Sequence, residues 1–106
     1  MGSDITTAKR AEASIEYLAS YDALTGLPNR NLFQMRLKRA ANHLRQQGEV
    51  FAVLSLDLDR FKNVNDALGH KMGDSLLVEA ARRIRAALAP DDMAARFGGD
   101  EFVILK

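Results

Sequence analysis

Four stretches of the chain carry a regular pattern of apolar residues, and each pattern predicts one element. Between Thr7 and Ser20, apolar side chains recur every three or four positions, a spacing typical of a helix with a narrow apolar seam. The same spacing predicts helices from about Asn31 to Gln47 and from about Met72 to Leu88, with most arginines and lysines off the apolar stripe. By contrast, the run from Val50 to Leu58 is apolar at successive positions, which favours a central strand covered on both faces.

Two shorter apolar runs near the end of the chain predict a hairpin. Met93 to Phe97 and Phe102 to Leu105 are joined by the sequence "GGDE", whose glycines are typical of a tight connection between antiparallel strands. The predicted order is therefore helix, helix, strand, helix, strand, strand. It indicates an α/β fold, an α+β sandwich with an antiparallel hairpin appended. Because no helix is predicted after the last of the three strands, we expect the chain to be the front part of a larger domain.

The first predicted helix has two interpretations. It could pack on its own domain, or it could form a short piece of a coiled coil between domains, since its seam is shorter than two heptads. The segment "DALTGLPNR" that follows concentrates Gly26, Pro28 and Asn29 and predicts a turn before the second helix. We therefore divide the chain into a linker helix, residues 1–20, and a domain portion, residues 21–106.

The composition narrows the class of protein. The chain has 106 residues, 47% of them hydrophobic, and a formal net charge of +1, which fits one soluble domain or part of one. A charge so close to zero argues against a broad electrostatic contact with nucleic acid or a membrane surface. The absence of cysteine excludes disulfides, thiolate metal sites and cysteine catalysis, and it is consistent with the cytoplasm. No apolar run is long enough to span a membrane, and no signal-peptide pattern is visible.

The ends of the predicted strands carry more carboxylates than turns require. Asp57 and Asp59 close the long apolar strand on the same side of the sheet, although Asp59 is more simply a cap of the next turn. Asp100 and Glu101 stand side by side in the hairpin, where like charges repel. If the hairpin lies beside the strand end, Asp57 joins them, and such a cluster requires a cation. Oxygen ligands favour Mg²⁺ or Mn²⁺, which commonly bind phosphates, so the pattern indicates a nucleotide substrate.

The segment "FKNVNDALGHKMGD" adds polar groups between the predicted strand and helix. Lys62 could neutralise phosphate charge if the segment is helical, or it could be a surface lysine. Asn65 and Asp74 offer a complementary donor and acceptor for a base edge, although each alone could be a helix cap, and His70 could simply start a helix. The two hairpin glycines would let the backbone approach a bulky ligand because they have no Cβ.

Three motifs together resemble the GGDEF family of diguanylate cyclases: "DALTGLPNR", "DLDRFKNVNDALGHKMGD" and "RFGGDEFVIL". They occur in this order, without an evident gap, over Tyr21 to Lys106. The preceding residues resemble the linker that often follows a PAS sensor domain. The resemblance implies a fold similar to the polymerase palm and to the catalytic core of adenylyl cyclases. It also implies the condensation of two GTP molecules into cyclic di-GMP, with release of two pyrophosphates, in a head-to-tail homodimer.

The resemblance further implies a role for each matching residue. Asp57 and Asp100 are expected to bind Mg²⁺ or Mn²⁺, assisted by the backbone carbonyl of Leu58. The choice of general base among the carboxylates is left open. The other expected contacts are Glu101 near the nucleophile, Lys62 on the phosphates, Asn65 and Asp74 on guanine with His70 nearby, and Gly98 and Gly99 where the nucleotide needs room.

Two departures from the family pattern change what we expect. Many members carry an inhibitory product site, Arg-x-x-Asp, before the hairpin; here the stretch is "APDD", with Ala89 in place of the arginine and Asp92 retained. We therefore predict weak or no product inhibition at this site. Members also continue through further elements that bring basic residues to the phosphates, so we expect this chain to be inactive in isolation.

Two other functions are compatible with the sequence. The chain could be a non-catalytic GTP-binding module, such as often precedes a phosphodiesterase domain, although its complete motifs favour catalysis. It could also be a relay that dimerises a sensor protein through its first helix. Only a nucleotide site should show Mg²⁺-dependent protection by GTP against thermal unfolding.

Overall fold

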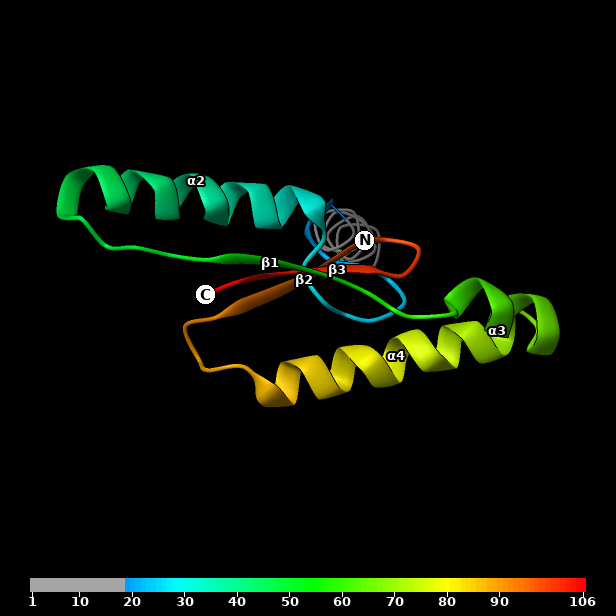
Figure 1. The fold of residues 1–106 in the computed structure, drawn as a ribbon. Helices are drawn as coiled ribbons and strands as arrows, with labels where there is room; N and C mark the ends of the chain where they lie inside the picture. The colour runs from blue at the N-terminus through cyan, green and yellow to red at the C-terminus, as the bar shows by residue number, and fades with distance from the viewer. Residues whose placement is uncertain (1–18) are drawn as a thin grey trace, which may run out of the picture.

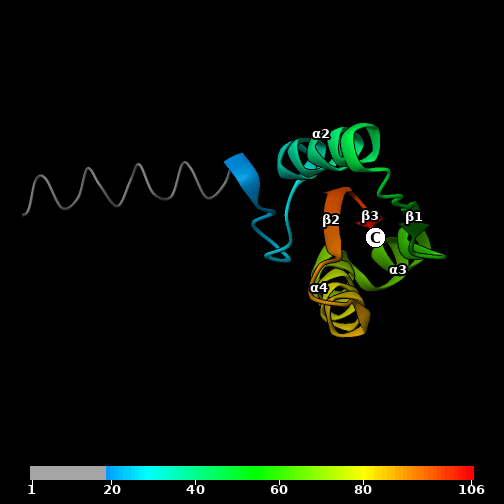
Figure 2. The same cartoon turned by 90° about the vertical axis from the view of Figure 1, so that its left-hand side faces the viewer.

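The structure, a computed structural model, describes residues 19–106 as a sheet between two helical layers (Figure 1). Figure 2 shows α2 on one side of the sheet and α4 on the other. The helix predicted for residues 7–20 lies outside the described residues, except for Ala19 and Ser20, which are helical. No helix within the described range is both long and apolar enough to cross a membrane. The elements are α2 (Arg30–Gln47), β1 (Val53–Asp57), α3 (Phe61–Leu68), α4 (His70–Ala87), β2 (Met93–Gly98) and β3 (Glu101–Leu105).

The three strands form one sheet in the order β1-β3-β2. Both outer strands are antiparallel to β3, so β1 and β2 run parallel to each other. The connection from β1 to β2 passes through α3 and α4, and β3 is inserted between the two strands, a split β-α-β arrangement. The predicted α/β sandwich with an antiparallel hairpin is therefore confirmed.

Alternation of side chains along β3 divides the core into two halves. Phe102 and Ile104 belong to the half on the α4 side, whereas Val103 and Leu105 belong to the half on the α2 side, and all four are buried. β3 is thus covered on both faces, and Glu101 is its first residue. The buried residues are Leu27, Leu77, Ala81, Ala94, Phe102 and Ile104 on the α4 side, and Phe33, Ala95, Val103 and Leu105 on the α2 side.

The prediction that the run from Val50 to Leu58 forms the centre of the sheet is wrong. The central strand is β3, and β1 lies at the edge. All five residues of β1 are exposed, including Val53 at 49% and Leu54 at 42%. The physical reason is that residues 19–106 leave both faces of this strand open, although its sequence is apolar on both. An apolar pattern indicates which surfaces avoid water and does not fix the position of a strand in the sheet.

The polar segment before the long helix is itself a helix, α3, which the predicted order did not separate from α4. Gly69 divides the two helices: its φ is 88°, and its amide donates to the Asn65 carbonyl at 2.9 Å. The predicted start of the following helix at Met72 is corrected to His70. A turn before the second helix was predicted correctly, and the Asn29 side chain caps that helix by accepting a hydrogen bond from the Leu32 amide at 3.1 Å.

Candidate functional site

The acidic residues of the hairpin lie beside the end of β1. Asp57 and Glu101 are direct cross-strand partners, so their side chains share one face of the sheet. One residue further, the Leu58 amide donates to the Asp100 carbonyl at 3.3 Å. The hairpin therefore meets the strand end, which is the condition on which the predicted acidic cluster depends.

Two glycines with positive φ build the hairpin turn. Gly98 and Gly99 have φ values of 140° and 51°, which residues with a Cβ rarely adopt. The register shifts between Arg96 and Gly98, so β2 carries an irregularity just before the turn. A Cβ on either glycine would meet no atom within 4 Å. The backbone shape alone accounts for glycine at both positions, and the expected contact with a nucleotide stays a prediction.

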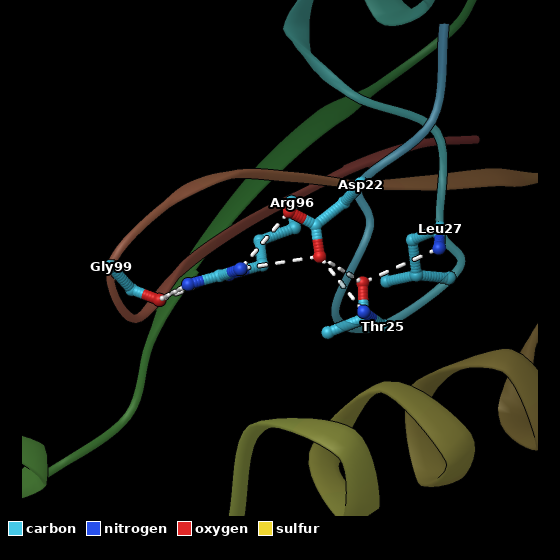
Figure 3. Close-up of polar contacts among 5 residues, drawn as sticks. All are labelled: Asp22, Thr25, Leu27, Arg96 and Gly99. Carbon is cyan, nitrogen blue, oxygen red and sulfur yellow. Dashed lines mark hydrogen bonds and ion pairs between the residues drawn. The ribbon is translucent and has the colours of Figure 1, made fainter. Parts of the chain in front are cut away.

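A single arginine links this turn to the start of the domain (Figure 3). The Nε and Nη2 atoms of Arg96 donate to the Gly99 carbonyl at 3.1 and 2.9 Å. Its Nη1 atom donates to both carboxylate oxygens of Asp22, at 3.0 and 3.2 Å. The two side chains are only 14% and 19% exposed. Because the guanidinium is planar and rigid, it fixes the tip of the hairpin relative to the loop that carries Asp22.

Asp22 is itself held by Thr25. The Thr25 amide and hydroxyl donate to Asp22 Oδ2 at 2.9 and 2.8 Å, and the Leu27 amide donates to the Thr25 hydroxyl oxygen at 3.3 Å. Burial alone raises the pKa of Asp22, but the hydrogen bonds from Thr25 and Arg96, together with the charge of Arg96, outweigh it. The pKa of Asp22 therefore lies below its usual value of 3.8, and the carboxylate is ionised at neutral pH.

Asp22 and Arg96 were not among the residues predicted from the sequence. Asp22 and Thr25 have the spacing of a local hydrogen-bonded turn, a signal that the sequence does carry. Nothing in the sequence links Asp22 to Arg96, which lies 74 positions further along the chain. The link depends on the loop lying against the edge of β2, where the Arg96 amide donates to the Pro28 carbonyl at 3.0 Å.

The second group of predicted residues lies on the two helices that follow β1. Lys62 is in the first turn of α3, His70 is the first residue of α4, and Asp74 follows one turn later; all three are exposed. Asn65, on α3, packs closely against Gly73 of α4. The hairpin turn and α3 lie at the same end of the molecule (Figure 1). Among residues 19–106, no hydrogen bond joins this group to the hairpin, so the two groups are neighbours without direct polar contact.

The hairpin carboxylates fit a hard divalent cation by their chemistry. Asp57, Asp100 and Glu101 offer only oxygen donors, which Mg²⁺ and Mn²⁺ prefer. Within the described part of the chain, no three His, Cys, Asp or Glu side chains lie close enough together to hold a metal ion. The predicted cluster of three carboxylates is therefore not formed among residues 19–106, and an ion here would take one or two carboxylates and complete its shell with phosphates and water.

The turn between α4 and β2 shows the role of the retained Asp92. Its Oδ2 accepts a hydrogen bond from the Ala89 amide at 3.1 Å and lies 3.4 Å from Lys106 Nζ. The Asp92 side chain is 10% exposed, so in this structure it stabilises the turn. Ala89 is exposed, and its side chain has no charge or hydrogen-bonding group.

Comparison with known proteins identifies the family. The family described as "Diguanylate cyclase, GGDEF domain" matches residues 19–106. Diguanylate cyclase TpbB of Pseudomonas aeruginosa is 50% identical over 93 residues, which cover 88% of this chain and 21% of that protein. The chain belongs to the GGDEF family, as its three motifs indicated.

Further similar proteins show the range within the family. Cyclic di-GMP phosphodiesterase PdeR of Escherichia coli is 46% identical over 104 residues, covering 98% of this chain and 15% of PdeR. The crystal structure of the coiled coil and GGDEF domain of DgcB from Caulobacter crescentus, in complex with c-di-GMP, matches with a TM-score of 0.85 at 32% identity. That match covers 98% of this chain and 55% of the DgcB chain. The chain thus spans a minor part of its curated relatives, which include both cyclases and phosphodiesterases.

Proposed function

We propose that this chain is the front part of a diguanylate cyclase domain that condenses two GTP molecules into cyclic di-GMP. The observation that carries the proposal is the register of β1 and β3, which pairs Asp57 with Glu101 next to the hairpin turn that contains Asp100. A turn with only a structural role needs no adjacent carboxylates, because like charges repel. Arg96 fixes the backbone of this turn through the Gly99 carbonyl, which supports a role in positioning.

In each half of the proposed reaction, the ribose 3′-hydroxyl of one GTP attacks the α-phosphorus of the other. A phosphate ester bond forms, the α–β anhydride bond breaks, and pyrophosphate leaves. The hydroxyl proton passes to a carboxylate of the hairpin, Asp100 or Glu101. Phosphoryl transfer depends mainly on positioning and on neutralising charge, and a hairpin fixed by Arg96 supplies the first of these. Because each domain binds one GTP, the active form is a homodimer.

Each group of predicted residues is proposed to contact a different part of the nucleotide. Mg²⁺ or Mn²⁺, held by Asp57, Asp100 and the Leu58 carbonyl, would neutralise charge on the phosphates when bound. Lys62, His70 and Asp74 are exposed and Asn65 is half-buried, which leaves these helix residues accessible to a ligand. The remaining proposed contacts are Lys62 with the phosphates, and Asn65, Asp74 and His70 with the guanine side of the nucleotide.

We propose one partner domain before this portion of the protein and one after it. Residues 1–20 would join a PAS-type sensor domain to the GGDEF portion, and the DgcB structure likewise combines a GGDEF domain with a coiled coil. A phosphodiesterase domain could follow, as the similarity to PdeR suggests. We place the protein in the cytoplasm, with no nucleic acid or membrane surface as a partner.

A second candidate function is a non-catalytic GTP-binding module that regulates a linked phosphodiesterase or sensor domain. The 46% identity to PdeR, a phosphodiesterase, favours this alternative. The complete hairpin sequence "GGDEF" and the paired Asp57 favour catalysis, because a regulatory module needs to bind GTP but not to activate its hydroxyl.

The test is incubation of the full-length protein with GTP and Mg²⁺, with the 106-residue chain in parallel, followed by chromatography for cyclic di-GMP and pyrophosphate. We expect product from the full-length protein and none from the chain alone. Asp100→Asn combined with Glu101→Gln should abolish turnover without changing thermal unfolding, whereas Asp91→Asn, at an exposed acid away from the hairpin, should keep activity. A folded protein that binds GTP and makes no product would instead support the regulatory module.

A further inference from the structure

Asn65 and Gly73 fit together where α3 packs against α4. A Cβ on Gly73 would fall directly on Asn65 Oδ1 and would lie 2.8 Å from its Cγ and 3.4 Å from its Nδ2. Gly73 is buried in the first part of α4, and its φ is not among the positive values that favour glycine. The helical backbone at this position would accept alanine, so what a Cβ here would change is the orientation of the Asn65 side chain, which would have to move.

The contact with Gly73 sets the orientation of the Asn65 carboxamide. Its Oδ1 is turned toward α4, is buried, and has no hydrogen-bond partner among residues 19–106. Asn65 as a whole is half-buried, and its Nδ2 is not closed off in this way, so the two amide hydrogens are available to a ligand. Packing alone does not explain this arrangement, because a buried acceptor without a partner costs free energy.

We infer that Gly73 is a positioning residue for base recognition: it admits the Asn65 oxygen against α4 and thereby presents Nδ2 as a donor to the O6 carbonyl of guanine. The inference rests on the proposed function. The next residue, Asp74, is exposed and offers acceptors for the N1 hydrogen and the 2-amino group of the same base. Adenine carries an amino donor where guanine carries O6, so a fixed donor at Asn65 discriminates against it.

Three substitutions separate this role from simple packing. Gly73→Ala places a methyl group where Oδ1 lies, so Asn65 must turn away. Asn65→Asp keeps the shape of the side chain, removes both amide hydrogens and adds a negative charge, so the loss that exceeds its effect on the second probe reports the lost donor. Asn65→Ala removes the side chain and clears the space that the new methyl group at Gly73→Ala needs.

The experiment measures binding of α,β-methylene-GTP, whose α–β bond is not cleaved, to the full-length protein by titration calorimetry. A second probe, 2-aminopurine riboside triphosphate, lacks both O6 and the N1 hydrogen and keeps the 2-amino group for Asp74. We expect Gly73→Ala and Asn65→Asp each to weaken binding of the first probe about tenfold or more, with little effect on the second. In the Asn65→Ala variant, adding Gly73→Ala should cause no further loss of affinity for the first probe, because both substitutions remove the same hydrogen bond to the base. Ser75→Ala, at an exposed position of the same helix, should bind like wild type.

Different failures point to different conclusions. If Gly73→Ala folds and binds the first probe like wild type, or if its effect multiplies with that of Asn65→Ala, the inference is wrong while the proposed function stands. If Gly73→Ala does not fold, Asn65→Asp decides, and unchanged affinity for the first probe overturns the inference. If the wild-type protein binds neither probe, the proposed function itself fails and the inference fails with it.

Discussion

Asp22 and Arg96 are joined by hydrogen bonds of 3.0 and 3.2 Å across a mostly buried contact between the first loop of the domain and the acidic hairpin. The same guanidinium donates to the Gly99 carbonyl, one residue before Asp100. The position of this backbone therefore depends on a loop that lies far away in the sequence, and the two parts are connected by one rigid group (Figure 3).

Replacing this group tests whether the hairpin must be held for turnover. Arg96→Lys keeps the charge, but a single ammonium group cannot bond to Asp22 and to the Gly99 carbonyl in the planar arrangement that the guanidinium provides. We expect kcat for cyclic di-GMP formation in the full-length protein to fall about 10- to 100-fold, with a much smaller change in KM for GTP. Arg83→Lys, at a side chain that is 75% exposed, is the matched control. Equal kcat values for the two variants would contradict a positioning role.

Asp22 should make the stability of the protein depend on acidity. Its pKa is below 3.8 in the folded protein, whereas in the unfolded chain it returns to about that value, so the unfolded state binds a proton first as pH falls. The stabilisation is complete above pH 3.8 and decreases as pH falls toward the lower pKa of the folded state. Asp22→Asn should lower the free energy of unfolding by about 1–3 kcal/mol at neutral pH, and this difference should shrink in acid.

The control for this prediction is a second carboxylate with a lowered pKa. Hydrogen bonds from Arg82 and Arg83 lower the pKa of Glu79 to about 2, but the three side chains are exposed, from 43% to 75%. Salt and water screen such surface pairs, so Glu79→Gln should change stability less than Asp22→Asn does at neutral pH. Urea unfolding between pH 2.5 and 7 measures both, and the prediction fails if the Asp22→Asn difference is constant over that range.

The parts of the fold that depend on local spacing could be predicted from the sequence. α2, α4 and the hairpin follow from apolar residues at regular intervals and from glycines at the turns. The edge position of β1 could not be predicted, because an apolar run shows that a surface avoids water and not which neighbour covers it. The separation of α3 from α4 depends on the positive φ of Gly69, which a glycine permits but does not require.

The candidate site, too, could be predicted from the sequence only in part. The sequence indicated that Asp57 would lie near Glu101 only on the condition that the hairpin lies beside the strand end, and the register of β1 and β3 meets that condition. The contact between Asp22 and Arg96 was not expected, because it depends on how a loop bends against the sheet edge. Gly73 stood inside a quoted motif without a role, since only the three-dimensional packing of two helices shows what its missing Cβ makes room for.

Phe102 links the site to the core. It follows Glu101 in β3, its side chain is fully buried, and it packs in the half-core that contains Leu77. Phe102→Ala should lower the free energy of unfolding by about 3–5 kcal/mol, through lost burial and the cavity that remains. Val50→Ala, at a side chain that is 86% exposed, should change it by less than about 0.5 kcal/mol. Urea titration followed by circular dichroism measures both, and similar midpoints for the two variants would contradict the assigned core.

The turn before β2 offers a gain of function. Asp92 is in place there and is held by the Ala89 amide, while Ala89 itself is exposed and uncharged. Ala89→Arg restores the Arg-x-x-Asp pattern and adds a planar group that can donate two hydrogen bonds to a phosphate or a guanine edge. We expect wild type to bind cyclic di-GMP weakly at this turn and Ala89→Arg to bind it at least about tenfold more tightly, with stronger product inhibition in the full-length protein. Ala87→Arg adds the same charge at the end of α4, outside the pattern, and should show no such gain. Titration calorimetry with cyclic di-GMP distinguishes the two, and equal affinities would mean that charge alone, rather than the restored pattern, governs binding at this turn.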